Sequence, residues 1–318
     1  GMTGTQRLTL LLTFTDGLTQ TIESDLTEQL AHFNDSHTAL EVSGTLKTPT
    51  AIQPGTSTIT NWQVQEEKDP ADAIGIYMLD AGTTNISESA ANRKYLTPDT
   101  DGKFSPAVTD QTIYFPVDGT RKVDFVAYYP YTAGLTGNMY KADISTQDTP
   151  ASIDLMTARI ASTADEPLDK DHTTVVFTFG HRLSRVEVNV EAGDGFTDAD
   201  LAGLTITLSN QPLKADFELL TDKLTPGSET GTITLNTAAN GQRASAIILP
   251  QEELTGRTLT FTMKDNSIFT WNVETDRTFE TGKKTVFNIR LARAGIEVIT
   301  SIQAWGIQGT VNGDIIQQ

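Results

Sequence analysis

Four histidines are the residues of this chain best suited to acid–base catalysis or metal binding, and they are widely spread. His32 and His37 lie close together, but two imidazoles without a third ligand make a weak metal site. His181 stands next to Arg182 and follows Asp171, so it could be imagined as a general base. The pattern around it instead predicts that its ring packs at a strand bend, with one ring nitrogen bonded to backbone.

Carboxylates are abundant, 41 in all, but no pair falls in a recognisable glycosidase pattern. Residues 99–102, Asp-Thr-Asp-Gly, resemble the start of a calcium loop but lack its third acidic position and its distal bidentate Glu. A tight turn is sufficient to explain Asp and Gly there. The GxSxG, HExxH, P-loop and GxGxxG motifs are absent. We therefore expect a protein that is not an enzyme and that has no cofactor or metal.

Aromatic residues offer a further kind of site, a platform for a sugar ring. Tyr128, Tyr129 and Tyr131 could form such a platform, but alternation along the strand buries part of the group. Tyr followed by Pro at a strand end is also commonly a packing feature. Trp62 and Trp305 are expected to plug the domain cores rather than to contact a ligand.

Composition excludes several classes of partner. The formal net charge of −18 disfavours nucleic acid and anionic membrane surfaces. The absence of cysteine excludes disulfides, thiol catalysis and thiolate metal sites. No apolar run is long enough to cross a bilayer, and no signal peptide is present. Gly1 before Met2 is interpreted as an expression scar, so the lack of a signal or lipid-attachment segment says little about location.

The elements that would position any site are predicted to be strands, and the stretch Thr174–Val190 is the most informative of them. Odd positions hold the apolar residues Val175, Phe177, Phe179 and Leu183, and even positions hold Val186, Val188 and Val190. Alternation marks strands with one buried face, and the change of parity flips that face. We therefore predict a bulge, or a bend from one sheet to another, between Gly180 and Val186. A polar segment, 161–171, precedes the stretch, which we interpret as the opening strand of a second domain.

Alternating runs separated by turn residues recur along the chain and predict an all-β fold. Leu8–Phe14 and Leu18–Ile22 flank Asp16-Gly17, a strong hairpin signal. Ser24–Phe33 is predicted to be a short helix, and Ala39–Leu46 a strand. A length of 318 residues favours two domains. We place the N-terminal β-sandwich at 1–165 and the C-terminal one at 166–318.

At this point the sequence resembles a known family. Several segments, in order, are similar to the two domains of the fimbrillin family, the type V pilins and fimbrillin-like surface proteins of Bacteroidales-type bacteria: Trp62, AIGIYML (73–79), DGKFSP (101–106), IYFPVDG (113–119), VDFVAYYPY (123–131), VVFTFGHRLSRVEVNV (175–190) and VFNIRLARAGIEVITSIQAW (286–305). The similarity spans about residues 60–310, whereas the first 50 residues match poorly. The signature positions that we single out are Trp62, Phe177, Phe179, His181, Leu183 and Trp305.

The resemblance implies two tandem transthyretin-like β-sandwich domains, made as a lipoprotein and exported to the outer surface. In polymerising members a protease cuts after Arg or Lys and removes an N-terminal strand, and a strand of another subunit fills the resulting groove. Here Leu8–Phe14 could be the removable strand. No basic residue occurs between Arg7 and Lys47, so Lys47 is the first site at which a cut could follow that strand and release residues 1–47. The alternative is that Lys47 is an ordinary loop lysine and the hairpin stays in place.

The resemblance favours a non-enzymatic fimbrial subunit or fimbria-associated protein of the cell surface. It would assemble with other fimbrial subunits by strand exchange, support adhesion or biofilm growth, and meet the outer membrane only through a lipid anchor. Whether it is a stalk, tip or anchor subunit stays open, and the residues after Trp305 could be a donor strand or the last strand of their own domain. A non-polymerising surface lipoprotein that binds a host glycan or protein is the second hypothesis. A secreted enzyme with an unrecognised carboxylate site is the third.

Overall fold

Strands make up most of this protein, as the predicted all-β class requires. A computed structural model describes the following residues: 7–13, 19–25, 38–46, 72–97, 103–252, 256–273, 278–293 and 295–304. Their helical elements are single turns, namely η1 (Thr109–Gln111), α2 (Pro150–Ile153) and η2 (Asp198–Leu201). None of these described helices has the length or the apolar character to cross a membrane.

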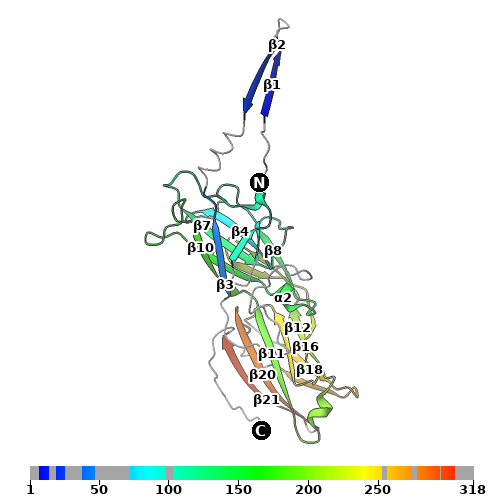
Figure 1. Ribbon diagram of the computed structural model, residues 1–318. Helices are drawn as coiled ribbons and strands as arrows, with labels where there is room; N and C mark the ends of the chain where they lie inside the picture. The colour runs from blue at the N-terminus through cyan, green and yellow to red at the C-terminus, as the bar shows by residue number, and fades with distance from the viewer. Residues whose placement is uncertain are drawn as a thin grey trace.

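The N-terminal hairpin is present as predicted. Strands β1 (Arg7–Thr13) and β2 (Thr19–Asp25) pair antiparallel from Arg7↔Asp25 to Thr13↔Thr19. They form a two-stranded sheet of their own, apart from the other strands in Figure 1. Because β2 runs through Asp25, the prediction of a helix beginning at Ser24 is wrong for its first two residues. The rest of that predicted helix lies outside the described residues.

The first large group of strands closes into a barrel in the order β10-β3-β6-β5-β4-β7-β9. Its strands are β3 (Glu41–Leu46), β4 (Ala73–Asp80), β5 (Arg93–Leu96), β6 (Lys103–Pro106), β7 (Val123–Tyr129), β9 (Met156–Ile160) and β10 (Thr174–His181). The inward side chains build one apolar core, including Ile74, Phe125 and Phe177, each 0% exposed. We expected a sandwich here. Alternation is the same for both architectures, and the hydrogen bonds between strands close the sheet instead.

The second group consists of two sheets around a common core. One has the order β16-β17-β11-β20-β21 and the other β15-β12-β18-β19. Side chains from both sheets, such as Val188 and Phe287 in the first and Phe261 in the second, belong to a single apolar cluster. The strands are β11 (Ser184–Ala192), β12 (Thr205–Pro212), β15 (Thr230–Thr234), β16 (Asn236–Thr237), β17 (Arg243–Ile248), β18 (Thr258–Thr262), β19 (Ile268–Asn272), β20 (Lys283–Ala292) and β21 (Gly295–Ala304).

A small three-stranded sheet combines a strand from the first half of the chain with two strands from the second half. Strand β8 (Met139–Asp143) pairs with β13 (Lys214–Glu218), which pairs with β14 (Lys223–Pro226). Tyr140 of β8 stands opposite Phe217 and meets the ring of Tyr128 edge-on, with 5.9 Å between ring centroids. A strand from the first half of the chain therefore contributes to the core of the second group.

The chain passes from one group to the other where the change of parity predicted a bend. β10 ends at His181 in the barrel and β11 begins at Ser184 in the five-stranded sheet, so the predicted sheet-to-sheet crossing is confirmed. Leu183 lies between the strands, 0% exposed, and its carbonyl accepts a hydrogen bond from the N–H of Gly282. The interpretation of the whole stretch as the opening of the second unit needs correction, because β10 pairs with β3 and β9.

Candidate functional site

The strand most relevant to function is β3, which lies between β10 and β6 in the barrel wall. It runs parallel to β10 over six residue pairs, from Thr174↔Glu41 to Phe179↔Leu46. Against β6 it pairs antiparallel, with Val42 opposite Phe104. In Figure 1 the blue β3 lies beside the green β10, although about 130 residues separate them in the sequence. Strand β3, from the N-terminal part of the chain, is thus one of the strands that close the barrel.

Alternate side chains of this segment fill the barrel core. Leu40 and Val42 are each 6% exposed and belong to the same apolar cluster as Phe177. Ala39 and Glu41 point the other way and are exposed. The period of two is that of a strand with one face in the core. Burial of a Leu and a Val side chain stabilises by roughly 1.5–3 kcal/mol each.

Backbone hydrogen bonds extend the attachment upstream of β3. The N–H of Leu40 donates to the carbonyl of Ile113 at 2.9 Å, and the N–H of Phe115 donates to the carbonyl of Thr38 at 3.0 Å. The N–H of Glu41 donates to the carbonyl of Thr173, also at 3.0 Å. Removal of this segment would therefore leave unpaired backbone groups along β10 and β6, above an uncovered apolar core. Such an open edge pairs readily with another strand.

The residues expected to govern proteolysis lie around this segment. Lys47 follows β3 directly and lies outside the described residues. Arg7 is the first residue of β1. Among the described residues β1 pairs with β2 alone, so β3, rather than Leu8–Phe14, is the N-terminal strand that is built into the barrel. The sequence predicted a strand at Ala39–Leu46, but nothing in it indicated that this strand would pair with β10.

The signature residues of the middle stretch are structural. Phe177 and Phe179 are 0% exposed in the barrel core, with 5.9 Å between their ring centroids. His181 packs at the bend, where its Nδ1 lies 2.9 Å from a carboxylate oxygen of Asp154. The side chains of this pair are 4% and 0% exposed, so a substrate cannot reach them. The prediction of a packed ring is confirmed, and Asp154 is a partner that the sequence did not predict. Trp62 and Trp305 lie outside the described residues.

The tyrosine platform is excluded by burial. Tyr128 and Tyr129 are 0% and 7% exposed. The hydroxyl of Tyr128 donates to Asn92 Oδ1 at 2.7 Å, and burial raises the pKa of Tyr128 well above its usual range. Only Tyr131 keeps part of its ring at the surface, with Lys94 Nζ 5.3 Å from the ring centroid. One partly exposed tyrosine does not make a sugar platform.

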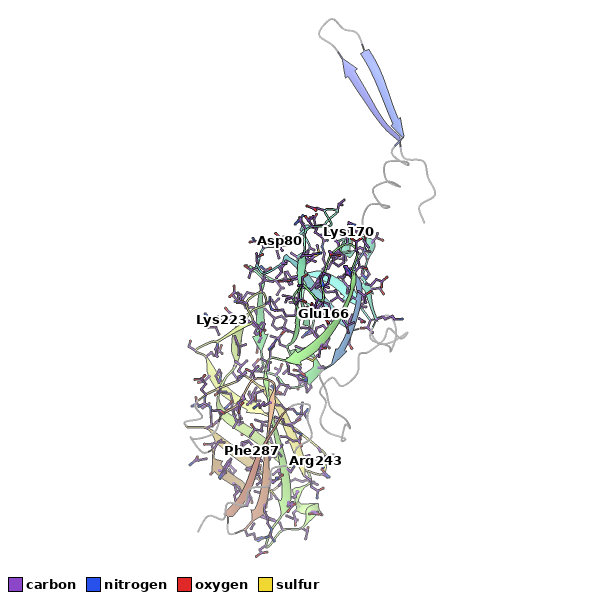
Figure 2. All side chains as sticks on the ribbon, turned by 90° about the vertical axis from the view of Figure 1, so that its left-hand side faces the viewer. Asp80, Glu166, Lys170, Lys223, Arg243 and Phe287 are labelled. Carbon is purple, nitrogen blue, oxygen red and sulfur yellow. The ribbon has the colours of Figure 1, made fainter. Side chains whose placement is uncertain are left out.

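A buried carboxylate fixes the loop that leads into β10. The side chain of Asp169 is 4% exposed and pairs with Lys122 Nζ and, at 2.8 Å, with His172 Nδ1. The hydrogen bond from Lys122 is the main reason that the pKa of Asp169 lies well below its usual range. Its neighbour Lys170 lies at the end of the barrel farthest from the second group of strands (Figure 2). In the part of the chain that the structure describes, no three His, Asp or Glu side chains are grouped to hold a metal.

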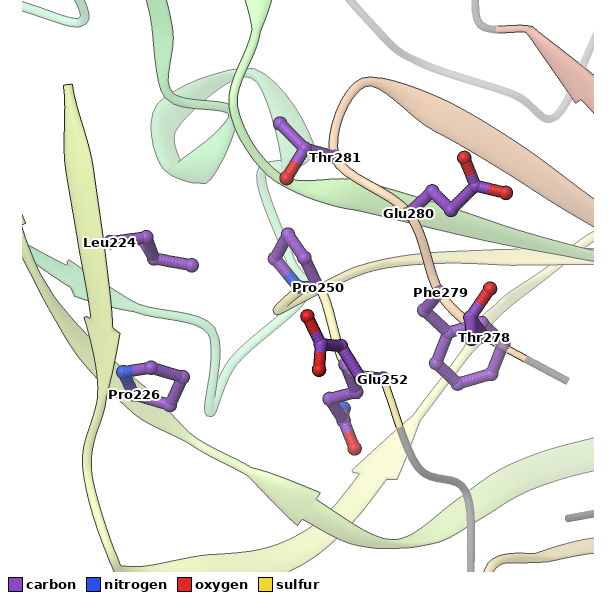
Figure 3. Close-up of a pocket in the computed structure, with 9 residues that line it drawn as sticks. Leu224, Pro226, Pro250, Glu252, Thr278, Phe279, Glu280 and Thr281 are labelled. Atoms are coloured by element: carbon purple, nitrogen blue, oxygen red, sulfur yellow. The ribbon is translucent and has the colours of Figure 1, made fainter.

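An open pocket of about 780 Å³ lies in the second group of strands (Figure 3). Leu224 and Pro226 line one side of it and Phe279 the other. The Glu280 carboxylate at its rim pairs with Lys283 Nζ at 2.7 Å. The described lining residues include no histidine and no cation: Leu224, Pro226, Pro250, Gln251, Glu252, Thr278, Phe279, Glu280 and Thr281. We assign no chemistry to this pocket.

Similarity to known proteins is extensive. A family model described as fimbrillin-like matches residues 63–305 of the chain. A curated protein of Bacteroides uniformis, named as fimbrium subunit Fim1C, is 39% identical over 248 residues. The matched residues make up 74% of this chain and 78% of that protein.

Solved structures share the fold. The crystal structure of a cell adhesion protein from Bacteroides uniformis covers 85% of this chain and 98% of its own chain, at 36% sequence identity and a TM-score of 0.71. A cell adhesion protein from Bacteroides ovatus covers 86% of this chain and 99% of its own, with a TM-score of 0.66 at 20% identity. The arrangement of strands described above is therefore similar to that of experimentally determined proteins along nearly their full length.

Proposed function

The chain belongs to the fimbrillin-like family, and we propose that it is a cell-surface protein of a fimbrium, either a fimbrial subunit or a fimbria-associated adhesion protein. The names of its relatives support this proposal, since one is a fimbrium subunit and another a cell adhesion protein. We further propose that it is not an enzyme and that it acts through contacts with other subunits.

The observation that carries the proposed mechanism is the position of β3, immediately before Lys47 and within the barrel wall. A cut after Lys47 removes β1, β2 and β3 together and opens a slot between β10 and β6. A strand of another subunit then fills the slot by β-augmentation, in which main-chain hydrogen bonds supply affinity and alternate side chains supply specificity.

The slot defines what its occupant must look like. The incoming strand runs parallel to β10 and antiparallel to β6, as β3 does. It carries apolar side chains at alternate positions, matching Leu40 and Val42, because those two side chains fill the core. A charged side chain at either position would be buried without a partner, at a cost of several kcal/mol.

The finer features of the family are also proposals. We propose that the two tandem domains, which the sequence divides at residue 165, are both of the transthyretin-like type: the second is a β-sandwich, and in the first the strands of such a sandwich close into the barrel. The pairing of β10 with β3 and β9 supports a division between His181 and Ser184 instead. Attachment to the outer membrane through a lipid anchor, and a role in biofilm growth, follow from the family resemblance.

A second candidate function is that of a non-polymerising surface lipoprotein that binds a host glycan or protein. The observation that favours it is the name of the 36% identical solved structure, a cell adhesion protein. It differs from the first in requiring neither removal of β3 nor an incoming strand. Binding of glycans or host proteins by the monomer, with no incorporation into filaments, would support it.

Electron microscopy with immunogold labelling tests the proposed function. The full precursor is expressed in a Bacteroidales-type host, and label along filaments or at their tips is the expected result. Lys47→Gln removes the cleavage site, so the filaments should no longer carry label. Lys47→Arg keeps a basic residue at this position, so the filaments should still be labelled. Label dispersed over the cell surface with the unaltered chain would contradict the proposal.

A further inference from the structure

One outer face of the second group of strands carries no charge. None of the residues in β12, β15, β18 and β19 is Asp, Glu, Lys or Arg. Elsewhere charge is plentiful, since 20% of the chain is charged and the net charge is −18. A neutral sheet face of four strands is therefore a departure from the character of the whole protein.

Threonines cover this face in register. Thr207 stands opposite Thr234 of β15 on one side and Thr260 of β18 on the other, and Thr260 stands opposite Thr270 of β19. One threonine from each of the four strands thus forms a row across the sheet. A second row contains Thr205, Thr262 and Ile268. We call the outward side chains of these four strands the threonine face.

The alternating neighbours show which way these threonines point. Ile206, Leu208, Ile233, Leu259 and Phe261 are each 0% exposed in the core. Successive side chains of a strand point to opposite faces, so the threonines between them point outward. At the margin, Ile268 is 64% exposed, one of the few large apolar side chains at the surface of the described residues.

The outer face of the partner sheet is charged, which shows that neutrality is a property of one side alone. Glu187 is on this side of β11, largely buried, with Lys284 at 3.3 Å and Arg185 at 3.8 Å. Glu191 and Arg290 stand further along the same two strands and are exposed. Figure 1 shows these strands, β11, β20 and β21, beside one another, whereas β12 and β18 belong to the other sheet.

We propose that the threonine face is a contact surface for a second copy of this chain, packed face to face about a two-fold axis. Two copies with a charge of −18 each repel one another, and this repulsion is smallest where neither surface is charged. A threonine hydroxyl both donates and accepts hydrogen bonds, so a threonine face is complementary to itself. An isologous contact requires such self-complementarity.

The size of the face sets the strength of the contact. Four strands spaced about 4.8 Å apart and five residues long cover roughly 300 Å². Stable complexes bury about 800 Å² on each partner, so the contact between two free molecules is weak. In a fimbrium many copies would face many others, and avidity would then hold neighbouring filaments side by side. This last consequence rests on the proposed function, whereas the contact itself does not.

Sedimentation velocity of the purified full chain tests the contact in the absence of filaments. At protein concentrations up to about 1 mM, where weak interfaces become populated, we expect a reversible dimer. Added salt should strengthen it, because salt screens the repulsion between two acidic molecules. Thr260→Glu places one negative charge from each copy at the centre of the contact, and it should weaken the dimer at least about tenfold. Thr178→Glu, on an exposed strand position of the barrel, is the matched control and should have no effect.

Two further variants separate the contact from a loss of folding. Thr260→Val keeps the shape and the neutrality of the side chain, so the dimer should persist. A mixture of Thr260→Glu and Thr260→Lys chains should dimerise where either alone does not. A chain that stays monomeric throughout, or equal effects of the two Glu substitutions, would overturn the proposal. Binding of a neutral oligosaccharide to the face without any dimer would also overturn it. None of these results would affect the immunogold test of the proposed function.

Discussion

Replacement of Leu40 and Val42 by alanine tests whether the N-terminal segment is a structural part of the unprocessed barrel. Both side chains are 6% exposed in the core. Leu→Ala in a core costs about 2–5 kcal/mol, and loss of two methyl groups from Val42 costs about 1.6 kcal/mol more. The two positions share one region of the core and will not add fully, so we expect a loss of about 4–6 kcal/mol. That corresponds to a fall of about 10–20 °C in the melting temperature of a unit of this size.

Thermal and urea unfolding of the full unprocessed chain, followed by circular dichroism, measure this loss. The matched control is Glu41→Ala with Ser43→Ala, which alters the opposite side of the same strand and should change stability by no more than about 1 kcal/mol. Unchanged stability of the Leu40→Ala/Val42→Ala variant would show that β3 does not occupy the barrel in solution. Equal losses in the two double variants would show that the assignment of its faces is wrong.

Three further perturbations have defined outcomes. Asp169→Asn should lower the free energy of unfolding at pH 7. The difference from the wild type should shrink as pH falls below about 4, because a carboxylate whose pKa is lowered by folding stabilises the fold only while it is ionised. Urea unfolding from pH 2 to 7 measures this difference. Gly241→Ala should be more destabilising than Gly82→Ala in thermal melts, although the two have φ values of +74° and +73°, because its Cβ would lie 1.7 Å from a backbone oxygen whereas Gly82 has open space; equal losses would contradict the steric argument. Phe177→Ala should cost about 3–5 kcal/mol, whereas the adjacent Val176→Ala, 54% exposed, should cost little in the same assay.

Local features of the fold were predictable because alternation depends only on neighbouring residues. The strands and the crossing between Gly180 and Val186 follow from which residues are apolar. The hairpin follows from Asp16-Gly17 between two such runs. The parity change at Leu183 and Val186 is the clearest case, since one shifted position moved the chain from one sheet to another.

Pairing of distant strands was not predictable from one sequence. β3 and β10 are parallel partners about 130 residues apart. The alternation of apolar residues in one strand does not indicate which other strand it pairs with. The same holds for β8 and β13, which join the two halves. Closure of the first group into a barrel depends on these pairings, because a barrel and a sandwich present the same pattern of buried residues. The candidate site therefore emerged only when β3 was placed beside β10.

Determination of the N-terminus of the protein in surface filaments tests the central claim most directly. The chain is recovered from filaments purified from a Bacteroidales-type host, and its N-terminus is determined by Edman sequencing or mass spectrometry. Cleavage after Lys47 predicts that the chain begins at Thr48, without β1, β2 and β3. A chain in the filaments that still contains Glu41–Leu46 would contradict strand exchange at this slot.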